Sequence, residues 1–253
     1  MASMERFGYE WSKFDRIIPE YETQFLKWVY PLKPEDFKGK KILDAGCGTG
    51  RNSYWPLAYG AKNVVAFDYD KRTVAVAKKS LSKFKNAHVR YRSIYKIKFS
   101  NEFDIAFSIG VIHHLENPHL AIDNLVKAVK KNGIVLIWVY GYEGNEFIVR
   151  FINPIRKVTS RLPLPIVNFL AYFMSVPFFV YLRALRQKHP YFNQLSKFRF
   201  WHLHSIVFDQ LIPRIANYWK KDEALNLLEN KALKDLKIFR VNNNSWTVIG
   251  RKR

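Results

Sequence analysis

The sequence has a single cysteine, Cys47, among its 253 residues. One cysteine excludes a disulfide framework within the chain and a metal site built on cysteines. Acidic residues are scarce as well, because 21 Asp and Glu stand against 42 Lys and Arg, a formal net charge of +21. The first residues lack the apolar run of a signal peptide, so a cytoplasmic protein is expected.

The basic excess would suit a nucleic acid, an anionic membrane surface or an acidic substrate. Much of it is lysine scattered along helical patterns such as 221–237, which is typical of a solvated helix face. The chain contains no recognisable RNA-binding or DNA-binding module, so a nucleic acid is not the expected partner. Hydrophobic residues make up 48% of the chain, which is enough for one large α/β domain.

Residues 40–51, KKILDAGCGTGR, are read as a buried strand that runs into a glycine turn. Gly46, Gly48 and Gly50 recur at every second position, and such spacing lets the backbone pass close to a bulky ligand. The dinucleotide-binding fingerprint is spaced G-x-G-x-x-G, whereas this turn is spaced G-x-G-x-G, with Asp44 two residues before the first glycine. The pattern therefore argues against NAD as the ligand.

The DAGCGTG segment resembles the first motif of class I S-adenosylmethionine-dependent methyltransferases, in which the turn lies beneath the methionine part and the ribose of the cofactor. Two further segments resemble later motifs of that family. AKNVVAFDYD, residues 61–70, ends a second strand in Asp68, at the position of the acidic residue that accepts hydrogen bonds from both ribose hydroxyls. EFDIAFSIGVIHHL, residues 102–115, resembles the fourth strand and its loop.

Strand and helix patterns alternate from Ile42 to Gly141 and predict a Rossmann-like, doubly wound α/β sheet. The resemblance implies seven strands, with the last one antiparallel between the fifth and the sixth. The expected strands are 41–45, 63–68, 87–92, 103–108, 133–140, 236–241 and 245–251. The expected helices of the core are 52–59, 71–83, 118–131 and 221–230.

This arrangement divides the chain into three regions. Residues 1–34 are expected to form an N-terminal helical arm that covers the cofactor. Residues 35–141 and 220–253 form the methyltransferase core. Residues 142–219 are a helical insertion after the fifth strand, on the ligand edge of the sheet, and are expected to act as a lid and substrate pocket.

The cofactor site is expected where the carboxyl ends of the strands share one edge. The resemblance implies S-adenosylmethionine as the cofactor. Ser93 stands where many relatives carry an Asp that contacts the adenine amino group, so this residue leaves the specificity for adenine less assured. The predicted cofactor residues are Asp44, Gly46, Cys47, Gly48, Gly50, Asp68, Tyr69, Ser93, Ile94, Ser108 and Ile109, with Tyr9 and Trp11 of the arm closing over them.

The segment GVIHHLENP places His113 and His114 after the fourth strand and resembles the VLHHL of ubiquinone- and menaquinone-biosynthesis methyltransferases. Adjacent side chains diverge and no third ligand lies near in sequence, so no metal is expected. The candidate catalytic residues are His113, His114, His202 and Tyr140. A structural role is the alternative for each histidine. His202 and His204 would share a face on a strand but not on a helix.

Residues 162–182, LPLPIVNFLAYFMSVPFFVYL, contain no charged residue and are flanked by Lys and Arg. Their length is about that of a membrane span, but Pro163, Pro165 and Pro177 argue against a simple spanning helix. A buried lid helix or a homodimer contact is the preferred interpretation. A lipid-facing helix, which would make the protein peripheral to a membrane, is the alternative.

The leading hypothesis is methyl transfer by direct displacement to a small, lipid-like acceptor, without a metal or a covalent intermediate. The segments 137–147 and 208–219 also resemble uncharacterised bacterial methyltransferases. Two alternatives stay open. One is a methyltransferase acting on RNA or protein, which the net charge suggests, and the other is a protein that binds the cofactor without catalysis.

Overall fold

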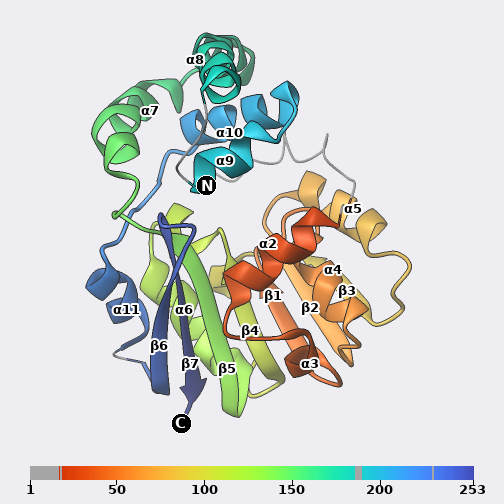
Figure 1. Ribbon diagram of the computed structural model, residues 1–253. Helices are drawn as coiled ribbons and strands as arrows, with labels where there is room; N and C mark the ends of the chain where they lie inside the picture. Colours follow the sequence, from red (N-terminus) through yellow and green to blue (C-terminus); the bar gives the residue numbers. More distant parts are fainter. Residues whose placement is uncertain (1–16, 18, 186–189, 230) are drawn as a thin grey trace.

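The computed structural model describes residues 17, 19–185, 190–229 and 231–253. At its centre lies a seven-stranded sheet in the order β3-β2-β1-β4-β5-β7-β6 (Figure 1). The first five strands run parallel, and β7 is antiparallel to both of its neighbours. The predicted doubly wound sheet, with its last strand between the fifth and sixth, is confirmed. The strands are β1 Lys41–Ala45, β2 Asn63–Asp68, β3 Ala87–Tyr91, β4 Phe103–Ile109, β5 Val129–Tyr140, β6 Leu233–Val241 and β7 Ser245–Lys252.

Helices cover both faces of the sheet, as Figure 1 shows. The helices α6 (Pro118–Ala128) and α11 (Lys221–Glu229) pack on one face around a core that includes Leu125 and Leu228. The helices α2 (Glu20–Val29), α3 (Pro34–Phe37), α4 (Arg51–Ala58) and α5 (Lys71–Ser80) lie on the other face. Short 3-10 turns, η1 (Ile94–Lys96) and η2 (Ile112–His114), follow β3 and β4.

Local signals explain where several core helices begin. The side chain of Asp70 accepts a hydrogen bond from the backbone N–H of Arg72 and caps α5. Asn117 caps α6 in the same way, with Pro118 at the first helical position. The largest difference from the predicted boundaries is β5, which begins at Val129, because Val129 pairs with Phe103 of β4. The polar residues that follow Val129 hid this start from the sequence pattern.

The segment between β5 and α11 is helical and stands above the carboxyl ends of the parallel strands (Figure 1). It contains η3, a π-helical turn (Ile148–Ile152), α7 (Asn153–Thr159), α8 (Leu164–Ala184), α9 (Pro190–Ser196) and α10 (Phe200–Leu211). It has its own small cores, one around Val167 and Phe208 and another around Leu182 and Leu203. A helical insertion after the fifth strand is thus confirmed.

Candidate functional site

The turn after β1 holds all three of its glycines in left-handed backbone conformations. The φ angles are 84° at Gly46, 52° at Gly48 and 83° at Gly50. A Cβ on Gly46 would collide with the side chain of Val111, which comes from the loop after β4. A Cβ on Gly48 would meet nothing within 4 Å. The turn is therefore pressed against the protein at Gly46 and open at Gly48, where a ligand can approach its backbone.

Replacing Gly46 with Ala should destabilise the fold more than the same change at Gly39. Both glycines have positive φ, 84° and 71°, but a Cβ on Gly39 meets nothing within 4 Å. Gly39→Ala should cost about 1 kcal/mol for the backbone conformation alone. Gly46→Ala should cost about 1–3 kcal/mol more, because Val111 must move. Urea denaturation of both variants measures the difference, and equal costs would show that Val111 yields freely.

Asp44 lies at the end of β1 and is the most deeply buried carboxylate of the site, with a relative exposure of 1%. Ser53 Oγ of α4 donates a hydrogen bond of 2.6 Å to its Oδ2. Its Oδ1 is buried and has no hydrogen-bond partner among the described residues. Burial raises the pKa of Asp44 to about 7, against the lowering effect of the Ser53 hydrogen bond. A buried acceptor oxygen without a donor is suited to a cationic ligand group.

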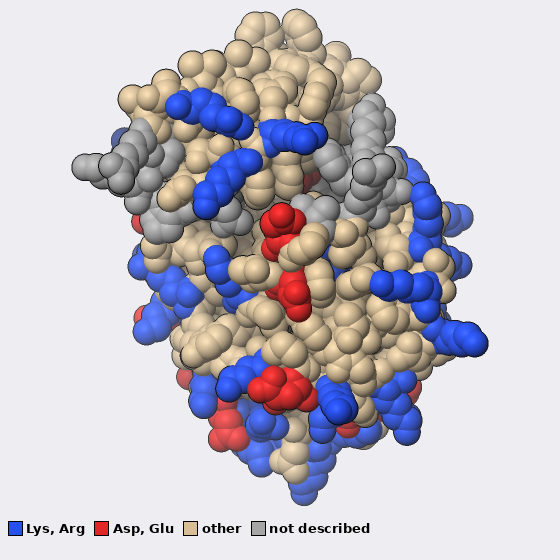
Figure 2. All heavy atoms as spheres, turned by 45° about the vertical axis from the view of Figure 1, so that its right-hand side comes forward, with Lys and Arg blue, Asp and Glu red and all other residues tan. Residues whose placement is uncertain are grey.

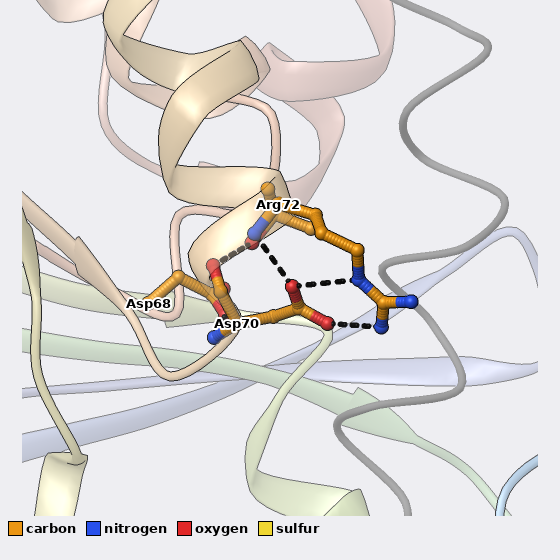
Figure 3. Close-up of polar contacts among 4 residues, drawn as sticks. Asp68, Asp70 and Arg72 are labelled. Carbon is orange, nitrogen blue, oxygen red and sulfur yellow. Dashed lines mark hydrogen bonds and ion pairs between the residues drawn. The ribbon is translucent and has the colours of Figure 1, made fainter.

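Asp68 ends β2 beside the glycine turn, and backbone amides hold its carboxylate in place. The N–H of Gly48 donates to Oδ2 at 2.9 Å, and the N–H of Asp70 donates to Oδ1 at 3.0 Å. Each oxygen keeps further acceptor capacity. Figure 3 shows the forked pair between Asp70 and Arg72, in which the guanidinium of Arg72 donates to both oxygens of Asp70. Asp68 is not a member of this pair. Asp70 therefore secures the start of α5, and Asp68 keeps its capacity to accept from a diol.

The other predicted cofactor residues at this edge differ in their burial and in their contacts. Ser108 is buried and donates to the carbonyl of Ala45 at 2.8 Å, which ties β4 to β1. Ser93 accepts from the N–H of Tyr95 at 3.3 Å. Ile94 and Ile109 are both buried in the core, at 6% exposure, and Cys47 is buried in the turn. Tyr69 stacks on Tyr91 at 5.2 Å. Tyr9 and Trp11 lie outside the described residues.

His113 is the central ring of an aromatic cluster at the ends of β4 and β5. It is fully buried, and neither ring nitrogen has a hydrogen-bond partner in the described part of the chain. Its ring stacks on Tyr140 with 3.7 Å between centroids, and Tyr140 in turn stacks on Tyr218 at 5.4 Å. Burial lowers the pKa of His113 well below its usual value. The ring is therefore neutral at neutral pH, with one nitrogen able to accept a proton.

The ring of His114, unlike that of His113, has a hydrogen-bond partner among the described residues. Its Nδ1 lies 2.7 Å from the carbonyl oxygen of Ile215. Because a carbonyl only accepts, Nδ1 carries the hydrogen and Nε2 is the acceptor nitrogen of the neutral ring. Burial lowers the pKa of His114 to about 4. His113 and His114 thus sit edge to face at 4.3 Å with different environments.

Arg156 of α7 is a residue of this cluster that the sequence did not reveal. It is buried, at 4% exposure. Its guanidinium donates to the carbonyl and the side chain of Gln210, to Asn153 and, at 3.1 Å, to the hydroxyl of Tyr218. Its positive charge lowers the pKa of both histidines. Arg150 and Lys157, on the same stretch, are basic as well, so no sequence signal distinguished Arg156.

The two histidines of α10 do not meet. His204 is buried against α8, where its ring nitrogens contact Ser175 at 2.9 Å and Asn168 at 3.0 Å. His202 stacks on Phe198 at 4.1 Å, and the charge of Arg51 acts on it. The charge of Asp209, also on α10, acts on Arg51 as well. Because Arg51 is the first residue after the glycine turn, α10 lies close to the cofactor edge.

These residues fit S-adenosylmethionine. Asp44 offers an unpaired acceptor for the ammonium group, Gly48 leaves space over the turn, and Asp68 offers acceptors for the ribose diol. No group of three or more His, Cys, Asp or Glu side chains suitable for a metal ion occurs in the ranges that the structure describes. Two surface hollows are lined by residues 78–90 and by residues 23–30 with 239–242, and neither lining includes a residue of the glycine turn.

The sheet order, the antiparallel seventh strand and the glycine turn at the end of β1 define a methyltransferase-type α/β fold. Solved structures agree. A S-adenosylmethionine-dependent methyltransferase from Aquifex aeolicus superposes with a TM-score of 0.57 at 17% identity, covering 97% of this chain and 98% of that one. Magnesium protoporphyrin IX methyltransferase from Synechocystis gives 0.55 at 12% identity, covering 92% and 82%.

Residues 43–137 match the family model described as a methyltransferase domain. The ubiquinone biosynthesis O-methyltransferase of Schizosaccharomyces pombe is 35% identical, over 51% of this chain and 49% of the relative. The tRNA U34 carboxymethyltransferase of Campylobacter curvus is 26% identical, over 62% and 54%. The chain spans about half the length of these relatives. Residues 43–137 thus form a methyltransferase domain of the class I, S-adenosylmethionine-dependent kind, and S-adenosylmethionine is the cofactor of that domain.

Proposed function

We propose that this protein transfers a methyl group to a lipophilic acceptor that bears an ionisable hydroxyl. The observation that carries the proposal is His113, a buried, neutral imidazole that has no hydrogen-bond partner in the described residues. An unpartnered polar side chain in a core costs about 1–3 kcal/mol. His113 lies in the turn that follows β4, at the carboxyl end of that strand, and the helical insertion stands above the carboxyl ends of the parallel strands (Figure 1). A proton-accepting role in the reaction explains why it is retained.

The residues divide the work as follows. Bound S-adenosylmethionine supplies a methyl carbon activated by a positively charged sulfur. Asp44 and Asp68 hold the cofactor at its ammonium group and its ribose. His113 accepts the proton of the acceptor hydroxyl, and the stacked rings of Tyr140 and Tyr218 fix the imidazole plane and keep water away.

The chemistry of the acceptor is inferred from the walls of the cluster. Tyr140, Tyr218 and Trp138 are aromatic, and Trp138 lies 6.0 Å from His113, so an acceptor with a flat apolar ring would find aromatic side chains to pack against beside His113. The buried charge of Arg156 lowers the pKa of the histidines. The same charge would lower the pKa of an acceptor hydroxyl and favour its anion. The quinone O-methyltransferases among the relatives are compatible with such an acceptor.

RNA is the rival acceptor, favoured by the net charge of +21 and by the tRNA-modifying relatives. A gel-shift assay with homopolymer RNA separates the two hypotheses. Binding that persists at physiological salt would favour RNA as the acceptor, and the loss of binding at that salt concentration would exclude the RNA hypothesis.

Calorimetric titration with S-adenosylhomocysteine tests the cofactor site. Asp68→Asn should weaken binding at least about tenfold, because one carboxylate acceptor is lost to the ribose. Asp104→Asn is the matched control, since Asp104 lies at the start of β4, pairs with Lys130 and accepts from Lys41 N–H. Equal affinity for both variants would contradict the assignment of Asp68.

The acceptor is tested by incubating the protein with tritiated S-adenosylmethionine and a total lipid extract. Radiolabel in the organic phase, absent with Asp68→Asn, is the expected result. Cofactor binding without label in lipid, RNA or protein fractions would leave a binding protein without methyl transfer and overturn the proposal.

A further inference from the structure

Helix α8 has two different faces. Val167, Ala171, Ser175 and Leu182 are buried on one side, where α8 packs on α10. The opposite side is a stripe of large apolar side chains at helical spacing that project into solvent. We call it the α8 stripe, and its members with their exposures are Ile166 (47%), Phe169 (62%), Leu170 (37%), Phe173 (67%), Val176 (48%) and Val180 (58%).

Such a stripe is unusual on a soluble surface, where apolar side chains occur singly. Phe169 and Phe173 pack edge to face at 5.3 Å, so the stripe is continuous at its centre. Trp201 of α10 extends it, because its ring is 63% exposed and lies 6.2 Å from Tyr172 of α8. The expectation of a buried helix at 162–182 therefore holds for only one face of α8.

The surroundings of the α8 stripe are basic. Residues 147–208 contain no Asp or Glu and nine Lys or Arg. Arg161 precedes α8 and Arg183 lies in its last turn, and both are exposed. In Figure 2 the upper end of the molecule is uncharged, and the charged groups visible just below it are Lys and Arg. The stripe is thus an apolar surface with a positive border.

The orientation of α8 decides how it can meet a membrane. By length and composition it is the one helix among the described residues that could cross a bilayer, with a mean hydropathy of 1.6 and 17% of the window buried. However, its buried face is tied to α10 by the contacts of His204 with Ser175 and Asn168. Figure 1 shows α8 nearly end on, lying across the top of the insertion. A helix held flat in this way lies in the plane of an interface.

The positive charge around the α8 stripe indicates which kind of partner can cover it. A second copy of this chain would bring two basic surfaces of the same kind together across a symmetric interface, and like charges repel. An anionic bilayer offers hydrocarbon for the stripe and negative headgroups for the border. We propose that the α8 stripe, with Trp201, inserts into the surface of an anionic lipid bilayer and holds the carboxyl edge of the sheet toward the membrane.

The test is co-sedimentation of the full chain with phosphatidylcholine vesicles, with and without phosphatidylglycerol. The wild type should sediment with the anionic vesicles, and binding should weaken as salt rises. Phe169→Ser with Phe173→Ser should weaken binding at least about tenfold, because two apolar anchors are lost. The matched control is Tyr30→Ser with Leu120→Ser, since these apolar side chains lie outside the insertion and are 54% and 41% exposed. The control should bind as the wild type does.

Two further measurements make the result specific. Tryptophan emission should shift to shorter wavelength on anionic vesicles, and Trp201→Phe should remove most of that shift. The protein should be released from vesicles by alkaline carbonate, as a surface-bound protein is. S-adenosylhomocysteine binding, measured on each variant, reports separately on the fold and the cofactor site, so it distinguishes failure here from failure of the proposed function.

Three outcomes would overturn the proposal. One is no sedimentation with anionic vesicles at low salt. Another is undiminished binding by the double Phe variant, which would mean adsorption through charge alone. The third is resistance to alkaline carbonate, which would mean that α8 spans the bilayer. A dimer that the double Phe variant abolishes, in a protein that ignores vesicles, would assign the stripe to a second copy instead.

Discussion

Asp44→Asn should make the ligand-free protein more stable at about pH 8 by up to about 4 kcal/mol. Burial raises the pKa of Asp44 from 3.8 to about 7. Between these values the folded protein holds a proton that the unfolded chain has released, so the free energy of unfolding falls as pH rises. Above about pH 7 the folded protein carries the full unfavourable charge. Asn carries no charge and can still accept from Ser53.

The advantage of the Asn variant should therefore disappear by about pH 4, where both states of the wild type hold the proton. Urea denaturation of the two proteins across this range measures it. An Asn variant that is no more stable at about pH 8 would mean that Asp44 does not carry its charge in a dry site.

The same substitution should weaken S-adenosylhomocysteine binding by about ten- to a hundredfold at about pH 8, because the charge-assisted bond to the ammonium group is lost. Wild-type affinity should fall as pH drops below about 7, since the cation needs the ionised carboxylate. Ser53→Ala should move this decline to higher pH, because the Ser53 hydrogen bond lowers the pKa of Asp44. Calorimetric titration over pH gives all three profiles. Opposite changes in stability and affinity would identify Asp44 as a ligand-binding group rather than a structural one.

The arrangement of the candidate cofactor residues could be predicted from sequence because its geometry is local. The turn Gly46–Gly50 follows β1 directly, and Asp68 ends the next strand, so one short segment and one parallel pairing bring them together. Such contacts depend on strand ends, which apolar runs and glycines mark well. The helix starts were also predicted correctly where a cap was visible, as at Asp70 and Asn117, whereas both of these helices end three residues earlier than predicted.

The cluster around His113 could not be predicted because its contacts join distant segments. Arg156, Gln210 and Tyr218 meet only once α7 and α10 have packed together. Because residues 200–211 form a helix, the side chains of His202 and His204 point in different directions. On a helix, positions two apart diverge, and His204 turns to α8 while His202 stacks on Phe198. No local pattern distinguishes His204, which is a packing residue, from His113, which is the candidate base.

His113→Phe should lower kcat by about 10²- to 10⁴-fold while leaving stability intact. Phe keeps the stacking contact with Tyr140 at 3.7 Å. The fold should lose nothing in polar contacts, since neither imidazole nitrogen has a partner in the described residues. Burial lowers the pKa of His113 well below 6.5, so the wild type should keep a flat kcat across neutral pH. The assay is S-adenosylhomocysteine release with the acceptor that the lipid screen identifies.

His204→Phe is the matched control, and it should show the reverse pattern. His204 is equally embedded, but its ring nitrogens contact Ser175 and Asn168. Removing them takes one partner from the buried Ser175, which keeps its bond to the carbonyl of Ala171, and one from the partly exposed Asn168. This should cost about 1–2 kcal/mol of unfolding free energy. Its ring lies between α8 and α10, away from the His113 cluster, so kcat should persist. If His113→Phe instead retained kcat, the imidazole would be a core residue, and the proton of the acceptor would have to leave by another route. One buried histidine has no hydrogen-bond partner in the described residues and the other has both ring nitrogens bonded, so the contrast between the two variants separates catalysis from packing within a single chain.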